Sequence, residues 1–274
     1  MSARKPADQL MRAVLWLFGV LTVAPFALLV LTSLKSREDL IAGAFVLPDR
    51  PHFENYVSAW VDGLFGTYFL NSVIVVLPVI VISVVLGTLC DFAFAFLKLP
   101  GKPLLFGMLL VGMMVPTEAF IIPLYYEFRW LGLINTYWAL ILPQVGMSIP
   151  FVTLFMTSAM RQLPKDLIDA AVADGASPFR VLRYVVVPLL GPSASTMSLF
   201  LFIWTWNEFM IPLILVQDDA TRTLPIGMLF FQGKYTIDIP ILTAGAVITL
   251  LPIVIVYFFF QRKFIQGLTA GAVK

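Results

Sequence analysis

Residues 68–97 read YFLNSVIVVLPVIVISVVLGTLCDFAFAFL and carry a single charged side chain, Asp91, in about 30 positions. A helix needs roughly 20 mainly apolar residues to cross the hydrocarbon core of a bilayer. The run is therefore long enough to cross a membrane, and its excess length predicts a helix that tilts or leaves the bilayer near Asp91. A barrel strand would show alternating segments of about ten residues, which this run does not.

Five further apolar runs repeat this pattern along the chain. Together they predict spans at residues 12–34, 68–97, 104–126, 136–159, 192–216 and 239–261. The composition agrees, because 60% of the 274 residues are hydrophobic and 12% are charged, about half the charged share of a soluble domain. The sequence thus predicts an all-α membrane protein with six transmembrane helices in a single domain, residues 1–274. Prolines within the spans are expected to kink them.

Lysine and arginine are distributed unevenly over alternate loops. Twelve lie in the N-terminus, the 98–103 turn, the 160–190 segment and the C-terminal tail, and six lie in the other loops. Positive charge favours the cytoplasmic side of a membrane. Both termini are therefore expected in the cytoplasm, and loops 35–66 and 217–238 outside.

Several kinds of chemistry lack the residues that they need. One cysteine, Cys90, and one histidine, His52, leave almost no ligands for a metal centre, so we expect no metal site and no catalytic residue. No G-x-x-x-x-G-K-[ST] phosphate loop occurs, so this chain is not expected to bind or hydrolyse ATP. The net charge of +2 gives no reason to expect nucleic-acid binding.

The segment between spans four and five has clear helix signals. Residues 160–190 read MRQLPKDLIDAAVADGASPFRVLRYVVVPLL. Pro164 suits the first position of a helix, and Gly175 suits a left-handed turn after Ala173. Ser177 and Pro178 suit the start of a second helix, which Pro188 is expected to end. The first helix is too short to be stable alone, so it must pack on something.

The composition of this first helix favours a protein partner. Its alanines allow close approach and its polar face is acidic, whereas a helix that lies on a lipid surface is usually basic there. An ordinary amphipathic linker on the membrane surface is the alternative.

These residues also resemble a known motif. Asp169-Ala170-Ala171, then Asp174-Gly175-Ala176, then Pro188 are similar to the EAA loop of binding-protein-dependent ABC importer permeases, with Asp169 where the family usually has Glu. The resemblance implies that the short helix is a coupling helix, which docks in a cleft on a cytoplasmic ATPase. Ala171 would then have to stay small to fit the cleft.

The resemblance covers most of the chain and is to carbohydrate-type permeases. It rests on Ser33-Leu34-Lys35, Asn55-Tyr56, Trp206-Asn207-Glu208-Phe209, Arg222-Thr223-Leu224-Pro225 and the ending Gly267-Leu268-Thr269-Ala270-Gly271-Ala272-Val273-Lys274. It implies the type I ABC importer fold, a bacterial inner-membrane location and import of a sugar or sugar-like solute.

The implied partners are a second, related permease subunit, most simply in a heterodimer, two ATPases that bind ATP and Mg²⁺, and an extracytoplasmic solute-binding protein. The implied role is transport rather than catalysis, with no cofactor bound by this chain and with lipid as its surroundings.

Polar and aromatic residues at membrane depth are candidates for the solute pathway. Trp204, Trp206, Asn207 and Glu208 could stack on a sugar ring and bond to its hydroxyls, and Tyr125 is a weaker candidate beside Glu118 and Tyr126. The alternative is that Asn207 and Glu208 bond to a neighbouring helix or to the second permease. Asn71 and Gln144 are expected to make packing hydrogen bonds.

Two other classes of protein fit part of the pattern. An ion-coupled secondary transporter or channel would need charged pairs at the midplane, of which few occur. A membrane scaffold would need neither proline-kinked helices nor a docking helix.

Overall fold

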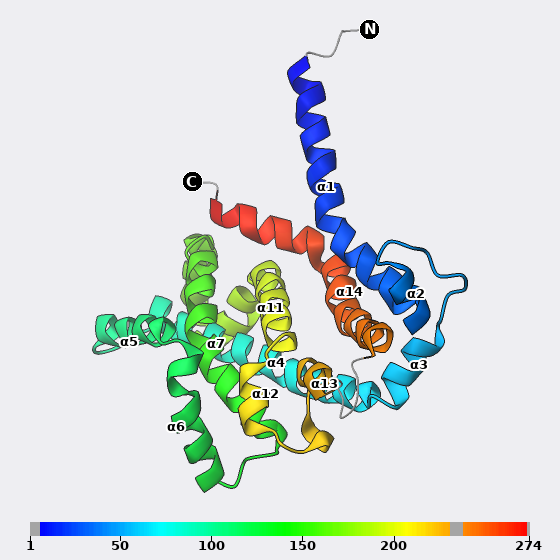
Figure 1. Cartoon of the computed structure of the whole chain (residues 1–274). Coiled ribbons are helices and arrows are strands. Elements are labelled where there is room, and N and C mark those ends of the chain that lie inside the picture. Colours follow the sequence, from blue (N-terminus) through cyan, green and yellow to red (C-terminus); the bar gives the residue numbers. More distant parts are fainter. Residues whose placement is uncertain (1–5, 231–237, 273–274) are drawn as a thin grey trace. The chain divides into compact units, whose positions relative to one another are not determined.

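The computed structural model describes residues 6–230 and 238–272, with side chains described over residues 8–229 and 238–261. Within these ranges the regular elements are all helices, so the all-α prediction is confirmed there (Figure 1). The chain forms two compact units, residues 1–66 with 227–251 (unit 1) and residues 67–226 with 252–274 (unit 2).

The elements follow one another along the chain as α1 (Pro6–Ser33), α2 (Arg37–Ala42), α3 (Glu54–Val61), α4 (Phe65–Phe96), α5 (Lys102–Met114), α6 (Thr117–Trp130), α7 (Tyr137–Met160), α8 (Lys165–Ala173), α9 (Pro178–Val181), the π-helical turn η1 (Leu182–Val186), α10 (Val187–Leu189), α11 (Gly191–Trp206), α12 (Met210–Leu215), the 3₁₀ turn η2 (Asp219–Thr221), α13 (Leu224–Phe230) and α14 (Ile239–Ala272).

Four of these helices are long and apolar enough to cross a membrane by themselves. They cover Asp8–Ser33, Phe65–Phe96, Tyr137–Met160 and Ile239–Gln261, close to the first, second, fourth and sixth predicted spans. Two bent pairs of helices bring the number to as many as six if each pair is one span. Helix α14 continues past the predicted span to Ala272, and Val273 and Lys274 of the predicted tail motif lie outside the described residues.

The third predicted span, 104–126, is not one helix. Helix α5 ends at Met114, α6 begins at Thr117, and the two are bent by 97°. Val115 is extended (φ −83°, ψ 116°), the conformation that a following proline favours. Pro116 therefore breaks this span rather than merely kinking it.

The fifth predicted span, 192–216, is also interrupted. Helix α11 ends at Trp206, and a separate short helix, α12, begins at Met210. The Asn207 side chain donates to the carbonyl oxygen of Ile203 (2.7 Å), and the Glu208 carboxylate accepts from the backbone N–H of Ile211 (3.1 Å). These side chains satisfy backbone groups on either side of the break.

Unit 1 is organised by buried polar groups after α1. Lys35 is fully buried, and its Nζ donates to the carbonyl oxygens of Gly43 (2.9 Å) and Ala44 (2.8 Å). The Asn55 amide donates to the carbonyl oxygens of Ser33 and Lys35, both at 2.9 Å. Two motif fragments that lie twenty residues apart, Ser33-Leu34-Lys35 and Asn55-Tyr56, are thus bonded directly to each other.

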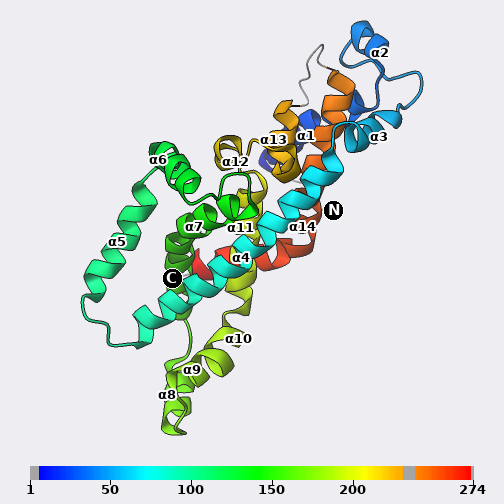
Figure 2. The ribbon, with the colours of Figure 1, turned by 90° about the horizontal axis from the view of Figure 1, so that it is seen from below.

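Unit 2 is built around α7, which packs against α5, α11 and α12 (Figure 2). Leu140 of α7, Val79 of α4 and Ile211 of α12 share one buried cluster. At Gly87 of α4 an added Cβ would overlap the side chain of Val152 in α7. A small residue there allows the two helices to approach closely, as is common in membrane bundles.

Candidate functional site

The predicted coupling segment, residues 160–190, begins with the predicted short helix. Helix α8 covers Lys165–Ala173, with Asp166 in its first turn, as the sequence predicts. Pro164 lies one position earlier than predicted, as the N-cap residue (φ −59°, ψ 116°). The carboxylate of Asp166 is placed favourably for the helix dipole.

Gly175 ends α8 in the predicted left-handed conformation (φ +79°). The N–H of Ala176 donates to the carbonyl oxygen of Ala171 (2.9 Å), and that of Gly175 to the carbonyl oxygen of Val172 (3.0 Å). This pair of bonds is the Schellman motif, which satisfies carbonyls that a helix end otherwise leaves free. The direction in which the chain leaves α8 is therefore fixed by hydrogen bonds.

One face of α8 packs on a buried cluster of unit 2, to which α8 itself belongs, and the rest of the helix is open. Ile168 is buried with Met160 and Leu182, and Ala171 and Ala176 pack against the same cluster. Leu167 and Val172 are 48% and 58% exposed. Asp169, Ala170 and Asp174 are exposed as well. Ala171 was expected to face a partner's cleft, but its methyl group packs on this chain, and Ala170 and Ala173 are the exposed alanines of α8.

The second helix of the segment begins as predicted and continues further. Ser177 has extended backbone (ψ 157°) and Pro178 is the first residue of α9. The helix then passes through the π-helical turn η1 and reaches Leu189. Pro188 therefore does not end it, contrary to the prediction; the bend of 72° follows at Leu190, before α11. A π-helical turn next to a proline is a common cause of a bent helix.

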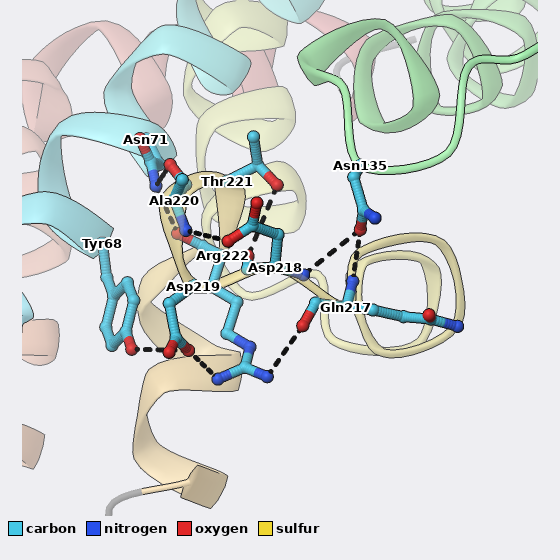
Figure 3. A network of polar contacts seen from close by, with 9 residues as sticks. All are labelled: Tyr68, Asn71, Asn135, Gln217, Asp218, Asp219, Ala220, Thr221 and Arg222. Carbon is cyan, nitrogen blue, oxygen red and sulfur yellow. Dashed lines mark hydrogen bonds and ion pairs between the residues drawn. The ribbon is translucent and has the colours of Figure 1, made fainter.

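The N-terminal end of α7, which is the end away from α8, carries a polar network (Figure 3). The Asn71 amide of α4 donates to the carbonyl oxygens of Ala220 (2.9 Å) and Arg222 (2.8 Å), and the Tyr137 hydroxyl donates to Asn71 Oδ1 (2.7 Å). The predicted packing role of Asn71 is confirmed. Gln144 bonds to the carbonyl oxygen of Leu140 within its own helix (2.9 Å).

Asn135 completes this network from the loop before α7. It has positive φ (+62°), and its Oδ1 accepts from the N–H groups of Gln217 (2.6 Å) and Asp218 (3.2 Å). Arg222 bonds to the Asp219 carboxylate and to the carbonyl oxygen of Gln217. Residues 217–222 therefore form a rigid loop. Asn135 was not among the residues expected from the sequence, although asparagine is one of the non-glycine residues enriched at such a backbone position.

The loop of residues 35–66 in unit 1 is held by charge-assisted bonds. Ser36 and Asp39 form a reciprocal capping box at the start of α2. The backbone N–H of Ser36, and then its hydroxyl, lower the pKa of Asp39 below its usual value. Arg37 pairs with Asp238, just before α14, at 2.7 Å.

The candidate pathway residues have different surroundings. Trp206 is 2% exposed and packs edge-on against Phe69 (5.5 Å between ring centroids), so its ring is part of the core and not of an open surface. Trp204 is 48% exposed, and its ring centroid lies 4.8 Å from that of Phe151. Asn207 is exposed, although its amide caps α11.

The remaining two candidates are half-buried. Glu208 accepts the N–H of Ile211, which agrees with a structural role for its carboxylate. Tyr125 of α6 packs against Tyr126 (5.6 Å). Of the five candidates, Trp204 thus offers the largest open aromatic surface, together with Phe151 and Phe200, which the sequence analysis did not identify.

The chain is similar to known proteins over nearly its whole length. Residues 83–269 match the family described as binding-protein-dependent transport system inner membrane component. The chain is 35% identical to the diacetylchitobiose uptake system permease protein NgcG of Streptomyces coelicolor, over 94% of this chain and 86% of that protein. It is 34% identical to the trehalose transport system permease protein SugB of Mycobacterium tuberculosis, over 95% and 91%.

A solved structure has the same fold. A chain in the crystal structure of a bacterial ABC transporter involved in the import of the acidic polysaccharide alginate aligns with a TM-score of 0.79 at 20% identity, over 96% of this chain and 100% of that chain. The predicted type I ABC importer fold is therefore confirmed.

Proposed function

The chain belongs to the family of binding-protein-dependent transport system inner membrane components, and we propose that it is the permease subunit of an ATP-driven importer for a sugar or sugar-like solute. The main support is α8, a short helix with one face packed on the cluster around Met160 and Leu182 and the other face open. Such a helix leaves apolar surface, at Leu167 and Val172, that a partner can cover.

The sugar class is supported by the relatives. The similar permeases named above serve the uptake of diacetylchitobiose and the transport of trehalose, and a third, the AraQ protein of Halalkalibacterium halodurans, serves the transport of arabinooligosaccharides. These solutes share a ring with many hydroxyl groups. An importer of this kind would pass such a solute through the path that this chain forms with a second permease subunit.

The ATPase would dock on the open face of α8. This face offers a hydrogen-bond acceptor at Asp169, a small side chain that permits close approach at Ala170, and an apolar contact at Leu167. Such a combination suits a cleft on a folded protein. The hydrogen-bonded end at Gly175 would transmit a movement of α8 to α9 and then to the bent junction with α11. ATP and Mg²⁺ would be bound by two such ATPases and not by this chain.

The solute-binding protein would dock at the opposite end of α7. Helix α7 separates Tyr137, in the polar network, from Met160, in the α8 cluster, and its 24 residues correspond to about 36 Å at 1.5 Å per residue. The loop 217–222 and α8 would therefore lie on opposite sides of a membrane. Both termini and α8 would face the cytoplasm of a bacterial cell, as the positive charges favour.

The solute would contact the aromatic group of Trp204, Phe151 and Phe200 from α11 and α7. Half-exposed aromatic faces suit the apolar faces of sugar rings. The buried Trp206 would instead hold α11 in place by packing on Phe69.

The transport role is tested in cells of the source organism that lack this chain. Uptake of labelled trehalose, diacetylchitobiose and an arabinooligosaccharide is compared in the deletion strain and in a strain complemented with the chain. Loss of uptake of one or more of these sugars, restored by the chain and abolished by ATP depletion, is the expected result. Uptake that depends on an ion gradient and persists without ATP would contradict it.

A further inference from the structure

A cavity of about 450 Å³ lies in unit 2, between the C-terminal part of α4, the start of α5, the end of α7 and the start of α8. Its size is in the usual range for small-molecule sites. Phe94, Phe106, Met160 and Ile168 give it apolar walls. The proposed pathway residues do not line it, so it is separate from the solute path described above.

A buried carboxylate lines the cavity. Asp91 is 1% exposed, and its Oδ1 accepts the hydroxyl of Thr157 at 2.6 Å. Its Oδ2 is buried and has no hydrogen-bond partner among the described residues. A buried acceptor that stays unpaired is costly, so a ligand that donates a hydrogen bond here would be favoured.

Three cations line the same cavity. Lys102, Arg161 and Lys165 come from α5, from the residue after α7, and from α8, and all three residues are exposed. The cavity therefore offers one buried negative group and three exposed positive groups. A metal ion would meet a single carboxylate and be repelled by the cations. A simple anion would satisfy the cations but give no donor to Asp91.

A ligand that carries both a primary amine and a phosphate satisfies both sets of groups. We propose that this cavity binds the headgroup of a phosphoethanolamine lipid, with its ammonium on Asp91 Oδ2 and its phosphate among Lys102, Arg161 and Lys165. A choline headgroup has no N–H to donate, and a glycerol headgroup has no positive charge.

The surroundings also favour a lipid over a protein segment. Helix α5 begins at the cavity and then exposes Leu104 (70%) and Met108 (63%), which can lie against acyl chains. Basic pockets between membrane helices commonly bind lipid headgroups. A lysine or arginine from a partner protein would satisfy Asp91 but leave the three cations uncompensated.

The test is native mass spectrometry of the full chain, purified with the subunits that accompany it. The protein is mixed with equal amounts of palmitoyl-oleoyl phosphatidylethanolamine, phosphatidylcholine and phosphatidylglycerol. The wild type should retain phosphatidylethanolamine roughly tenfold over each of the others, because a charge-assisted hydrogen bond contributes on that order. Asp91→Asn, which keeps the size of the side chain and an acceptor for Thr157, should lose this preference.

Lysine variants test the phosphate contact independently of Asp91. Lys102→Ala should weaken retention of phosphatidylethanolamine, whereas Lys98→Ala, an exposed lysine in the same turn that does not line the cavity, should not. Equal retention of the three lipids by the wild type would overturn the proposal. So would a preference for phosphatidylglycerol, an unchanged preference in Asp91→Asn, or a co-purifying peptide that cross-links to the cavity in place of lipid.

Discussion

Ala176 donates its backbone N–H to the carbonyl oxygen of Ala171 at 2.9 Å, across Gly175 at φ +79°. This bond ties the end of α8 to the start of the next helix, while the methyl groups of both alanines pack on the same buried cluster. The proposed coupling segment is therefore a preformed unit and not a flexible linker. Its stiffness is what would let a movement at α8 reach the membrane helices.

The loss of uptake caused by a substitution at Gly175 should depend on how well the new residue tolerates positive φ. No atom lies within 4 Å of a Cβ built there, so the cost is backbone strain, about 1–2 kcal/mol for an ordinary L-residue. Gly175→Val should lower ATP-driven uptake strongly, and Gly175→Asn should keep most of it, because asparagine accepts this conformation. Uptake is measured at equal membrane abundance, and equal activity of the two variants would contradict the role of the turn.

A large side chain at Ala170 should block the ATPase without unfolding the chain, because Ala170 is exposed. Ala170→Trp is expected to lose co-purification of the ATPase and to keep the thermal stability of the wild type. Ala171→Trp should instead lower stability, since Ala171 packs on the buried cluster. Ala220→Trp, in the exposed loop at the other end of α7, is the matched control and should keep the ATPase.

Asn71→Ala should loosen the loop of residues 217–222. The substitution removes the donor to two part-buried carbonyl oxygens, and a hydrogen bond of this kind contributes about 0.5–1.5 kcal/mol. Hydrogen exchange of residues 217–222 should become faster, and Tyr137→Phe, which removes only the bond to Asn71 Oδ1, should have a smaller effect. Unchanged exchange in Asn71→Ala would show that Asn135 and Arg222 hold the loop by themselves.

The two tryptophans of α11 should give opposite phenotypes. Trp204→Ala is expected to reduce uptake with little loss of stability, because its ring is 48% exposed. Trp206→Ala should destabilise the protein by about 3–5 kcal/mol, because it empties a buried site. Thermal unfolding and uptake are compared for both, and normal transport by Trp204→Ala would remove the aromatic group from the proposed pathway.

The capping box of α2 should depend on pH. The hydrogen bonds from Ser36 lower the pKa of Asp39 below 3.8 in the folded chain, so the ionised form stabilises α2 above that pH. This stabilisation is lost as the pH falls through the lowered pKa. Hydrogen exchange of residues 37–42 should therefore rise below about pH 4, and Asp39→Asn should remove this pH dependence. A wild-type profile that matches the variant would contradict the capping role.

Most of the helical architecture could be predicted, because long apolar runs specify helices regardless of their packing. The two breaks could not. Pro116 follows Val115 with no other stop signal, and the interruption after Trp206 depends on the bonds that Asn207 and Glu208 make in the folded chain.

The helices of the proposed coupling segment could be predicted in position but not in orientation. Proline and glycine mark the ends of α8, but which alanine faces outward depends on the cluster around Met160 and Leu182, which forms only in the fold. For the same reason the sequence did not distinguish the buried Trp206 from the open Trp204, two residues away.

The proposed binding of an ATPase to the open face of α8 can be tested directly. A single cysteine is placed at Ala170 in a chain with Cys90→Ser, cross-linked mildly in native membranes of the source organism, and the adduct is identified by mass spectrometry. We expect an adduct with an ATP-binding subunit from Ala170→Cys and no such adduct from the control Ala220→Cys. An adduct with lipid alone, or the same adduct from both positions, would contradict it.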